Sequence, residues 1–156
     1  MIAVKIMDAK NAGIIVDTLA GIFSDKPALR FSSPYELLVA VILSAQCTDE
    51  RVNKVTSVLF KEYDTPEKML TLSEKELEKY IFSCGLYKTK AEHILSASRA
   101  IVRDFGGEVP DTLEGLRSLA GVGRKTANVV YSVAFGGAAI AVDTHVFRVA
   151  NRIGLT

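Results

Sequence analysis

Apolar residues recur at helical spacing along almost the whole chain, and this periodicity constrains the fold more than any other feature. Leucine, isoleucine, valine and alanine repeat three or four positions apart, so that they share one face of a helix. Clear stripes lie within residues 37–45, 52–59 and 91–105. The one tempting strand, residues 140–142, is too short to build a sheet. The sequence therefore predicts an all-α fold of about eight or nine short helices.

Helix starts and stops are marked by residues that suit those positions. Ser33 and Thr65 each precede a proline, which pairs a capping hydroxyl with a residue favoured at the first helical position. Two further starts have capping-box spacing, one from Ser73 to Glu76 and one beginning at Asp111. Glycines stand where helices would stop, at positions 85, 106–107, 136–137 and 154. These signals predict tight connections and no interior linker.

The composition suits one soluble globular domain with a substantial core. The chain has 156 residues, of which 49% are hydrophobic and 24% charged, as is typical of a single folded domain. No apolar run could span a bilayer and the N-terminus lacks a signal-peptide core, so we expect a cytoplasmic protein with no membrane partner. Cys47 and Cys84 stand alone in the sequence, which favours core residues over a metal or redox motif.

The charges are unevenly distributed although the formal net charge is only +1. From Arg117 to the C-terminus five basic residues accompany a single acid, Asp143, whereas acids predominate between Lys61 and Tyr80. Ordinary solvated helix faces would explain this pattern, and so would a basic surface for an anionic partner.

The segment LAGVGRKTAN at residues 119–128 is the most informative motif. A short Gly-x-Gly turn between two helices leaves backbone N–H groups open at a helix start, where a phosphate can bind. Gly121 and Gly123 are expected to allow close approach and unusual backbone angles, and both would suffer from any side chain. Lys125 stands just past this turn, beside the bound group. For an isolated lysine, a solvated side chain or a simple phosphate contact would be the plainer interpretation.

Five ordered segments, including this motif, resemble the endonuclease III family of DNA glycosylases, which carry a helix-hairpin-helix. The resemblance covers roughly residues 25–153. Its segments are LLVAVILSAQCTD, GLYKTKA, GEVP, LAGVGRKTANVV and AVDTHVFRVANR. Ala120 departs from the family pattern, in which proline is usual there, and should reduce rigidity more than function.

The resemblance implies the helix-hairpin-helix glycosylase fold, with a six-helix lobe at residues 25–137. Residues 1–24 and 138–156 would then form parts of a second helical lobe. Family members usually continue into further helices and a four-cysteine iron–sulfur cluster. Neither cysteine lies in that region, so we expect no cofactor in this chain and a truncated second lobe. The helix expected at residues 11–23 would lack a full partner for its apolar residues Ile14, Ile15, Leu19 and Ile22.

The resemblance also implies a function, a glycosylase and abasic-site lyase that acts on oxidised pyrimidines in duplex DNA during base excision repair. Breaking a glycosidic bond develops positive charge at a sugar carbon, which an unprotonated amine can attack to form a Schiff base before β-elimination. Lys125 matches the family's amine. Asp143, in VDTH, matches its catalytic aspartate, which can take a proton from the lysine. Asp143 is also typical of a helix N-cap, and capping alone is the alternative.

Further residues are assigned to DNA contacts by the same resemblance. Gln46 and Leu86 match the pair that fills the gap left by a flipped nucleotide, although composition alone suggests a surface amide and a core leucine. Thr144 and His145 would support Asp143, with a packing or phosphate-side role for His145. The hairpin residues expected to bind phosphate are Gly121, Val122, Gly123, Arg124 and Thr126.

A non-catalytic DNA-binding module is the alternative function. Both interpretations predict a monomer that binds duplex DNA less tightly as salt increases. Only the enzyme predicts strand cleavage at an abasic site.

Overall fold

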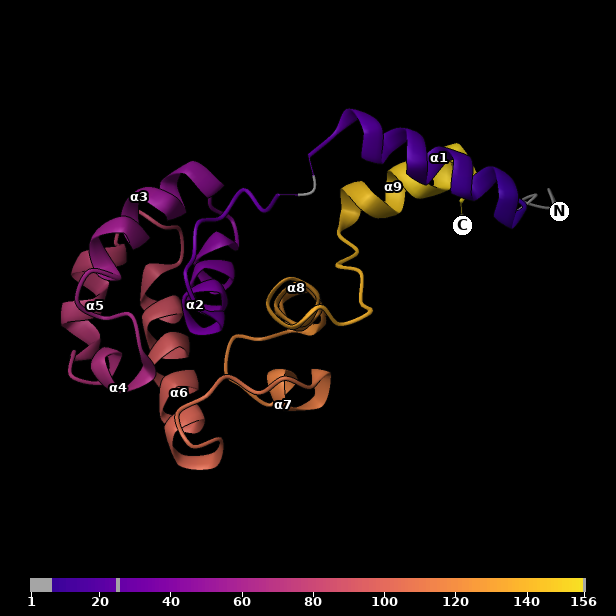
Figure 1. Cartoon of the computed structure of the whole chain (residues 1–156). Helices are drawn as coiled ribbons and strands as arrows, with labels where there is room; N and C mark the ends of the chain where they lie inside the picture. The colour runs from indigo at the N-terminus through magenta and orange to yellow at the C-terminus, as the bar shows by residue number, and fades with distance from the viewer. Residues whose placement is uncertain (1–6, 25, 156) are drawn as a thin grey trace, which may run out of the picture. The chain divides into compact units, whose positions relative to one another are not determined.

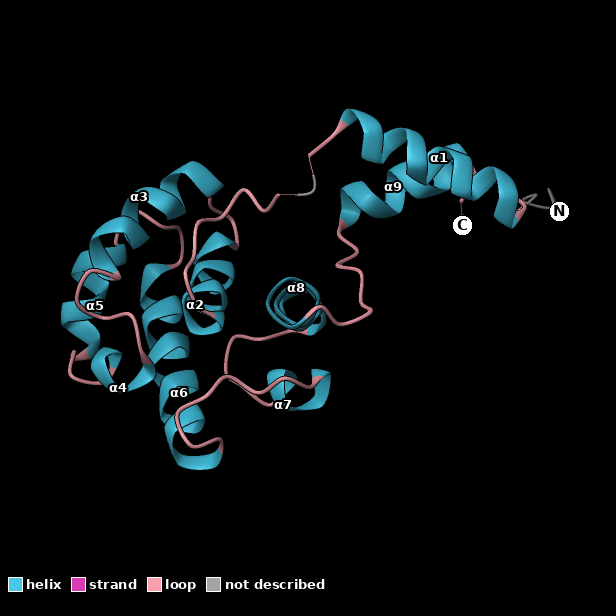
Figure 2. Cartoon of the chain, in the orientation of Figure 1, coloured by secondary structure: helices cyan, strands magenta, loops and turns pink. Residues whose placement is uncertain are grey.

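The computed structural model describes residues 7–24 and 26–155, which form nine helices and no strand (Figures 1 and 2). The all-α prediction is confirmed, and residues 140–142 lie in an irregular connection. The helices are α1 (Ala9–Ile22), α2 (Pro34–Ser44), α3 (Asp49–Leu59), α4 (Pro66–Met69), α5 (Glu74–Ile81), α6 (Tyr87–Asp104), α7 (Leu113–Arg117), α8 (Arg124–Phe135) and α9 (Thr144–Ile153).

The chain separates into two compact units. The larger unit, Ala28–Ala141, contains α2 to α8, and the smaller unit combines the chain up to Pro27 with the chain from Val142 onward. The larger unit thus has seven helices where six were expected. Two of them, α4 and α7, are single short turns that Thr65 and Thr112 cap individually.

Helix α2 forms the centre of the larger unit, because every residue from Tyr35 to Leu43 is buried. A helix can be buried on all sides only if it is apolar all round, and Glu36 is the one charged residue of this stretch. Its carboxylate accepts the N–H of Ser32 at 2.5 Å. Helix α2 packs against α3, α6 and α8, while α6 also contacts α4 and α5. The core of the unit is therefore built around α2 and α6.

The helix starts follow the predicted caps in most cases. Ser33 accepts the N–H of Glu36 at 3.1 Å, with proline at the first helical position. The complete capping box that begins at Ser73 is present. The start predicted at Asp111 is wrong by one residue: Thr112 has the extended backbone, and its hydroxyl accepts the N–H of Gly115 at 3.1 Å.

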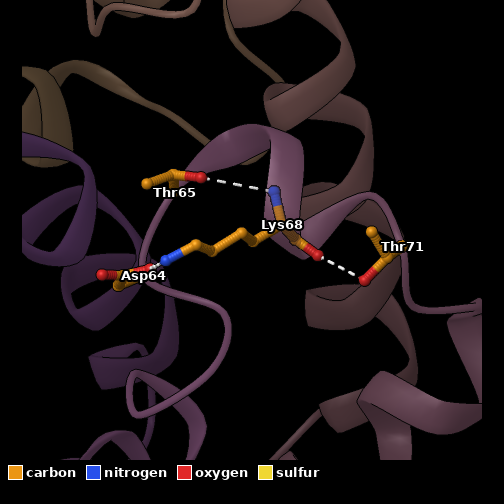
Figure 3. A network of polar contacts seen from close by, with 4 residues as sticks. All are labelled: Asp64, Thr65, Lys68 and Thr71. Atoms are coloured by element: carbon orange, nitrogen blue, oxygen red, sulfur yellow. Dashed lines mark hydrogen bonds and ion pairs between the residues drawn. The ribbon is translucent and has the colours of Figure 1, made fainter.

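Helix α4 has only four residues, and local polar contacts hold it (Figure 3). Thr65 accepts the N–H of Lys68 at 3.3 Å, and the Lys68 ammonium lies 2.7 Å from Asp64. Thr71 donates its hydroxyl to the Lys68 carbonyl at 2.7 Å and so closes the other end. These contacts support a turn too short to be stable by itself.

The smaller unit consists of α1 and α9, and neither helix has a buried residue. The N–H of Met7 donates to the Gly154 carbonyl at 3.0 Å and joins the two segments. Helix α1 begins at Ala9, earlier than expected, because Asp8 caps it by accepting the N–H of Asn11 at 2.8 Å. Its apolar face is exposed as predicted, with exposed fractions of 55%, 41% and 68% for Ile14, Leu19 and Ile22.

Candidate nucleic-acid interface

A tight turn joins α7 to α8, and two buried side chains anchor it. Leu119 and Val122 belong to the core of the larger unit, and the N–H of Val122 donates to the Leu119 carbonyl at 3.2 Å. Between them the turn exposes Gly121. The Val122 side chain therefore serves the core, and a ligand at this turn would meet its backbone.

Gly121 is required by the backbone of the turn, whereas Gly123 is not. The φ of Gly121 is +74°, in the left-handed region that glycine favours. A Cβ at Gly121 would lie 2.8 Å from the Cβ of His93 and 2.9 Å from its Cγ. Gly123 has a φ of −82°, and a Cβ there would meet nothing within 4 Å. The expectation of unusual backbone angles at both glycines is thus wrong for Gly123.

We expect Gly121→Ala to destabilise the larger unit, with Gly123→Ala as the matched control. A left-handed backbone costs a residue with a Cβ about 1–2 kcal/mol. The contact with His93 adds about 1–3 kcal/mol, because the atoms it meets lie close to the α6 backbone and move little. Gly123→Ala should cost only about 1 kcal/mol or less, since it replaces a favourable N-cap residue. Urea denaturation measures both effects, and equal midpoints would contradict this account of the turn.

Helix α8 begins without a side-chain cap. Gly123 is its N-cap, and the N–H of Ala127 is the one that donates to the Gly123 carbonyl, at 2.9 Å. The first N–H groups of a helix have no acceptor within the helix itself. Arg124 and Lys125 are exposed here, Thr126 is half-buried, and the first turn contains no acidic residue. An open helix start with two cations is well suited to bind a phosphate.

Gln46 lies at the tip of a β-turn that directly follows α2. The N–H of Cys47 donates to the Ser44 carbonyl at 3.1 Å. Ala45 has φ −58° and ψ 118°, and Gln46 has φ 52°, which are the angles of a type II turn. Glycine or asparagine normally occupies this positive-φ position, because a Cβ is disfavoured there. In this chain an exposed glutamine holds it.

Leu86, at the start of α6, has a positive φ like that of Gln46. Its φ of 59° and ψ of 32° are left-handed, and it is the N-cap of the helix without a side-chain hydrogen bond. The side chain is 60% exposed, so the interpretation of Leu86 as a core leucine is wrong. A large apolar side chain on a left-handed backbone adds little to the stability of the fold.

Gln46 and Leu86 are the two non-glycine residues with positive φ in the described part of the chain. Their turns are neighbours, because a Cβ on Gly85 would lie 3.1 Å from the Gln46 carbonyl oxygen. Exposed residues held in a strained conformation cluster at functional sites, where the strain serves the mechanism. The fold thus brings together two residues that are far apart in the sequence.

Helices α6 and α8 share a feature that distinguishes them from the other helices of residues 7–24 and 26–155. Their N-caps, Leu86 and Gly123, make no side-chain capping hydrogen bond. Every other described helix begins with a serine, threonine or aspartate whose side chain accepts a backbone N–H. The two uncapped starts are those at which the sequence predicts DNA contacts, and open helix starts attract phosphate.

Asp143 belongs to the smaller unit, where it is the N-cap of α9. Its Oδ1 accepts the N–H of His145 at 3.0 Å and that of Val146 at 2.8 Å, so the predicted capping role is confirmed. Thr144 begins the helix and is exposed. The exposed His145 places its Nδ1 3.4 Å from the Arg148 guanidinium. Lys125 belongs to the larger unit.

Lys90 is a buried lysine that the sequence motifs did not single out. It is 4% exposed and lies in the first turn of α6, directly after the Leu86 turn. The sequence contained a signal for its burial, because Lys90 has the helical spacing of Ile94, Ala97 and Ile101, which share the buried face of α6. Lysine is rarely buried without internal partners, so a lysine on an apolar stripe indicates a specific role.

Cys47 and Cys84 lie in the larger unit, half-buried and buried respectively, which confirms them as core residues. Burial and the neighbouring Cys47 raise the pKa of the Cys84 thiol to about 11. A four-cysteine iron–sulfur cluster takes four thiolates, whereas the chain has two cysteines. The described residues also hold no cluster of three or more side chains suited to a metal ion.

Comparison with known proteins relates the whole arrangement to one family. Residues 39–156 match the HhH-GPD superfamily of base excision DNA repair proteins. Endonuclease III of Bacillus subtilis strain 168 is 50% identical over 150 residues, which cover 96% of this chain and 68% of that protein. Endonuclease III of Escherichia coli K12 is 53% identical over 124 residues, which cover 80% of this chain and 59% of that protein.

A solved structure shows the same likeness in three dimensions. A trapped covalent endonuclease III–DNA intermediate, an estranged-adenine complex, matches with a TM-score of 0.88 at 48% identity. The match covers 95% of this chain and 70% of that one. The chain spans 59% of the length of the Escherichia coli protein and 72% of the length of endonuclease III of Treponema pallidum strain Nichols. Within the described residues, no helix combines the length and the apolar content needed to cross a membrane.

Proposed function

The chain belongs to the HhH-GPD superfamily of base excision DNA repair proteins, and from this we propose that it is a DNA glycosylase with abasic-site lyase activity. The proposed substrate is duplex DNA that contains an oxidised pyrimidine or an abasic site. The position of Lys125 carries the proposal: it is an exposed amine in the first turn of an uncapped helix, directly behind the glycine turn. A similar protein has been trapped in a covalent complex with DNA.

Lys125 would supply the nucleophile of the reaction. Its neutral Nζ attacks C1′ of the sugar, and the glycosidic bond breaks as its electron pair leaves with the base, which takes up a proton. Loss of a proton from nitrogen and opening of the sugar ring then give the Schiff base. Removal of a proton from C2′ expels the 3′ phosphate by β-elimination, and water releases the lysine. The positive end of the α8 dipole would hold the neighbouring phosphate during these steps.

Asp143 would act as the acid–base partner of Lys125 in addition to capping α9. A carboxylate can accept a proton from the attacking amine and stabilise cationic character at the sugar. Thr144 and His145, the first residues of α9, would support Asp143 at this end of the helix.

Gln46 and Leu86 would open the duplex so that the damaged nucleotide can leave the stack. Enzymes that act on a base extrude it, and an inserted side chain compensates for the lost stacking. An exposed leucine and an exposed glutamine on adjacent strained turns provide an apolar wedge and a hydrogen-bonding group. Leu86 is also the N-cap of α6, so the apolar wedge lies at one of the two helix starts that are expected to bind phosphate.

The proposed reaction needs no cofactor, because an amine and a carboxylate supply its nucleophile and its acid–base group. We further propose that this chain alone holds no iron–sulfur cluster, since it has two cysteines and the cluster takes four. The proposed location is the cytoplasm, where the DNA of a bacterial or archaeal cell lies.

Incubation with a duplex that contains one abasic site tests the proposed function. We expect cleavage of the strand on the 3′ side of the site and, with borohydride present, a covalent protein–DNA adduct. A non-catalytic helix-hairpin-helix module would bind the duplex, more weakly at higher salt, and would form neither product. Binding without cleavage and without adduct would therefore overturn the lyase proposal.

We expect Leu86→Gly to separate function from stability. Glycine relieves the left-handed strain, and the exposed side chain contributes little packing, so stability should stay equal or rise by up to about 1 kcal/mol. Cleavage of a lesion-bearing duplex should fall roughly tenfold or more, because the wedge that compensates for unstacking is lost.

Val58→Ala is the matched control for this change. Val58 is also an exposed apolar residue, at 54%, but it lies on α3 in a regular helix. Both its stability and its cleavage rate should remain close to wild type. A clear loss of stability in Leu86→Gly would show instead that Leu86 serves the core.

A further inference from the structure

The side chain of Lys90 reaches across from α6 to the end of α2. Its Nζ donates to the Leu43 carbonyl at 2.8 Å and to the Ala45 carbonyl at 2.6 Å. The last carbonyls of a helix have no partner within it, so Lys90 satisfies two acceptors at the end of α2. Ala45 is also the residue directly before Gln46 in the type II turn.

The main chain of the same residue holds the second turn. The N–H of Lys90 donates to the Leu86 carbonyl at 3.0 Å and thereby closes the first turn of α6. Lys90 thus bonds the Gln46 turn through its side chain and the Leu86 turn through its backbone. A single residue therefore connects the two turns.

The side chain of Lys90 is buried, and its ammonium is directed at these two carbonyl oxygens. Lys90 is 4% exposed, and burial lowers the pKa of its side chain. Its hydrogen-bond acceptors are two carbonyl oxygens rather than a carboxylate. Burying a charge is expensive unless hydrogen bonds compensate for the lost water, and here the carbonyl oxygens of Leu43 and Ala45 provide that compensation. Since both acceptors lie at the end of α2, the ammonium fixes the backbone that leads into the Gln46 turn.

We propose that Lys90 is a positioning residue for nucleotide extrusion, which holds Gln46 and Leu86 at the separation needed to enter a duplex together. The inference rests on the function proposed above for that pair. A side chain that replaces a base in the stack must resist the neighbouring base pairs as they close. Turns with a positive φ at a non-glycine residue relax readily unless the surrounding structure holds them, and Lys90 provides that restraint for both.

Insertion of the pair can be measured with a duplex that carries 2-aminopurine opposite a stable abasic analogue, since the fluorescence of 2-aminopurine rises when this opposite base loses its stacking. Saturating wild-type protein should produce a clear rise. Lys90→Met has similar length but no donor, and it should lose about half of the rise or more, because the wedge pair is no longer held. Affinity for an undamaged duplex should change by less than about twofold, because phosphate contacts determine it.

Two further variants distinguish a positioning role from general destabilisation. Lys90→Arg retains donors for both carbonyls and should recover most of the fluorescence rise. Lys75→Met, which removes an exposed lysine on α5, should match wild type. In a Leu86→Gly background, Lys90→Met should cause little additional loss, because Lys90 acts through the pair. Should Lys90→Met fail to fold, Lys90→Gln keeps N–H donors on a shorter, uncharged side chain and should give an intermediate rise.

Hydrogen exchange tests the same inference without DNA. In Lys90→Met the amides of Cys47 and of residues 86–90 should exchange faster, while the amide of Ala127 in α8 should not change. Wild-type exchange together with a wild-type fluorescence rise in Lys90→Met would overturn the inference and leave the proposed function standing. Absence of any rise with wild-type protein would overturn the extrusion role proposed for Gln46 and Leu86 and, with it, the role of Lys90, whereas strand cleavage tests the lyase function separately.

Discussion

Lys125→Ala is expected to abolish borohydride trapping and to lower abasic-site cleavage by a factor on the order of 10³ or more, because it removes the nucleophile. Folding should be unaffected within about 0.5 kcal/mol, since Lys125 is exposed. The measurement is the yield of the covalent adduct on a denaturing gel, together with the single-turnover rate of strand cleavage.

Lys125→Arg separates the nucleophile from a simple phosphate contact. The guanidinium keeps the positive charge at the start of α8 but stays protonated, so it cannot form a Schiff base. DNA affinity should therefore be retained while trapping and cleavage are lost. If Lys125 only bound phosphate, the arginine variant would remain active. Lys75→Ala, at an exposed position on α5, is the control for loss of a surface lysine and should trap like wild type.

Asp143→Asn should reduce base release by about 10²–10⁴-fold, the usual contribution of an acid–base group, without disturbing α9. Asparagine is as good an N-cap as aspartate, so it can keep the hydrogen bonds from His145 and Val146. The amide cannot accept a proton from the attacking amine. Single-turnover base release from a lesion-bearing duplex measures the loss, and circular dichroism checks the helix content.

Asp8→Asn is the matched control, because Asp8 caps α1 by the same type of contact. Its activity should remain at the wild-type level. If capping were the whole role of Asp143, Asp143→Asn would be as active as Asp8→Asn. Asp143→Ala would then be the damaging change, through loss of about 1 kcal/mol of helix stability.

The helical architecture could be predicted because its signals are local. A capping hydroxyl needs only the amides two or three residues ahead, and Ser33, Thr65 and Ser73 all behave as predicted. The one displaced start shows the limit of this approach. Asp111 and Thr112 are adjacent residues that both suit an N-cap, and backbone conformation placed the cap at Thr112.

The functional pair was assigned from resemblance alone, because no local signal identifies it. Composition favoured a core position for Leu86, yet the structure exposes it. Positive φ at a glutamine and at a leucine runs against residue preference, so neither turn could be derived from propensity. Sequence patterns also could not reveal that the two turns are neighbours or that Lys90 connects them, since these are contacts between helices.

The sequence by itself determined the helical fold class, most helix starts, the glycine turn before α8 and the matched lysine and aspartate. These features depend on periodicity, caps and motifs within a few residues of one another. Only the tertiary structure decided that Gly121 faces His93 and that the turns of Gln46 and Leu86 are neighbours. It also decided that α6 and α8 alone among the described helices begin without a side-chain cap. The physical reason is that packing of α2, α6 and α8 around a common core brings distant backbone segments together, and strain at those segments persists only when that packing holds it.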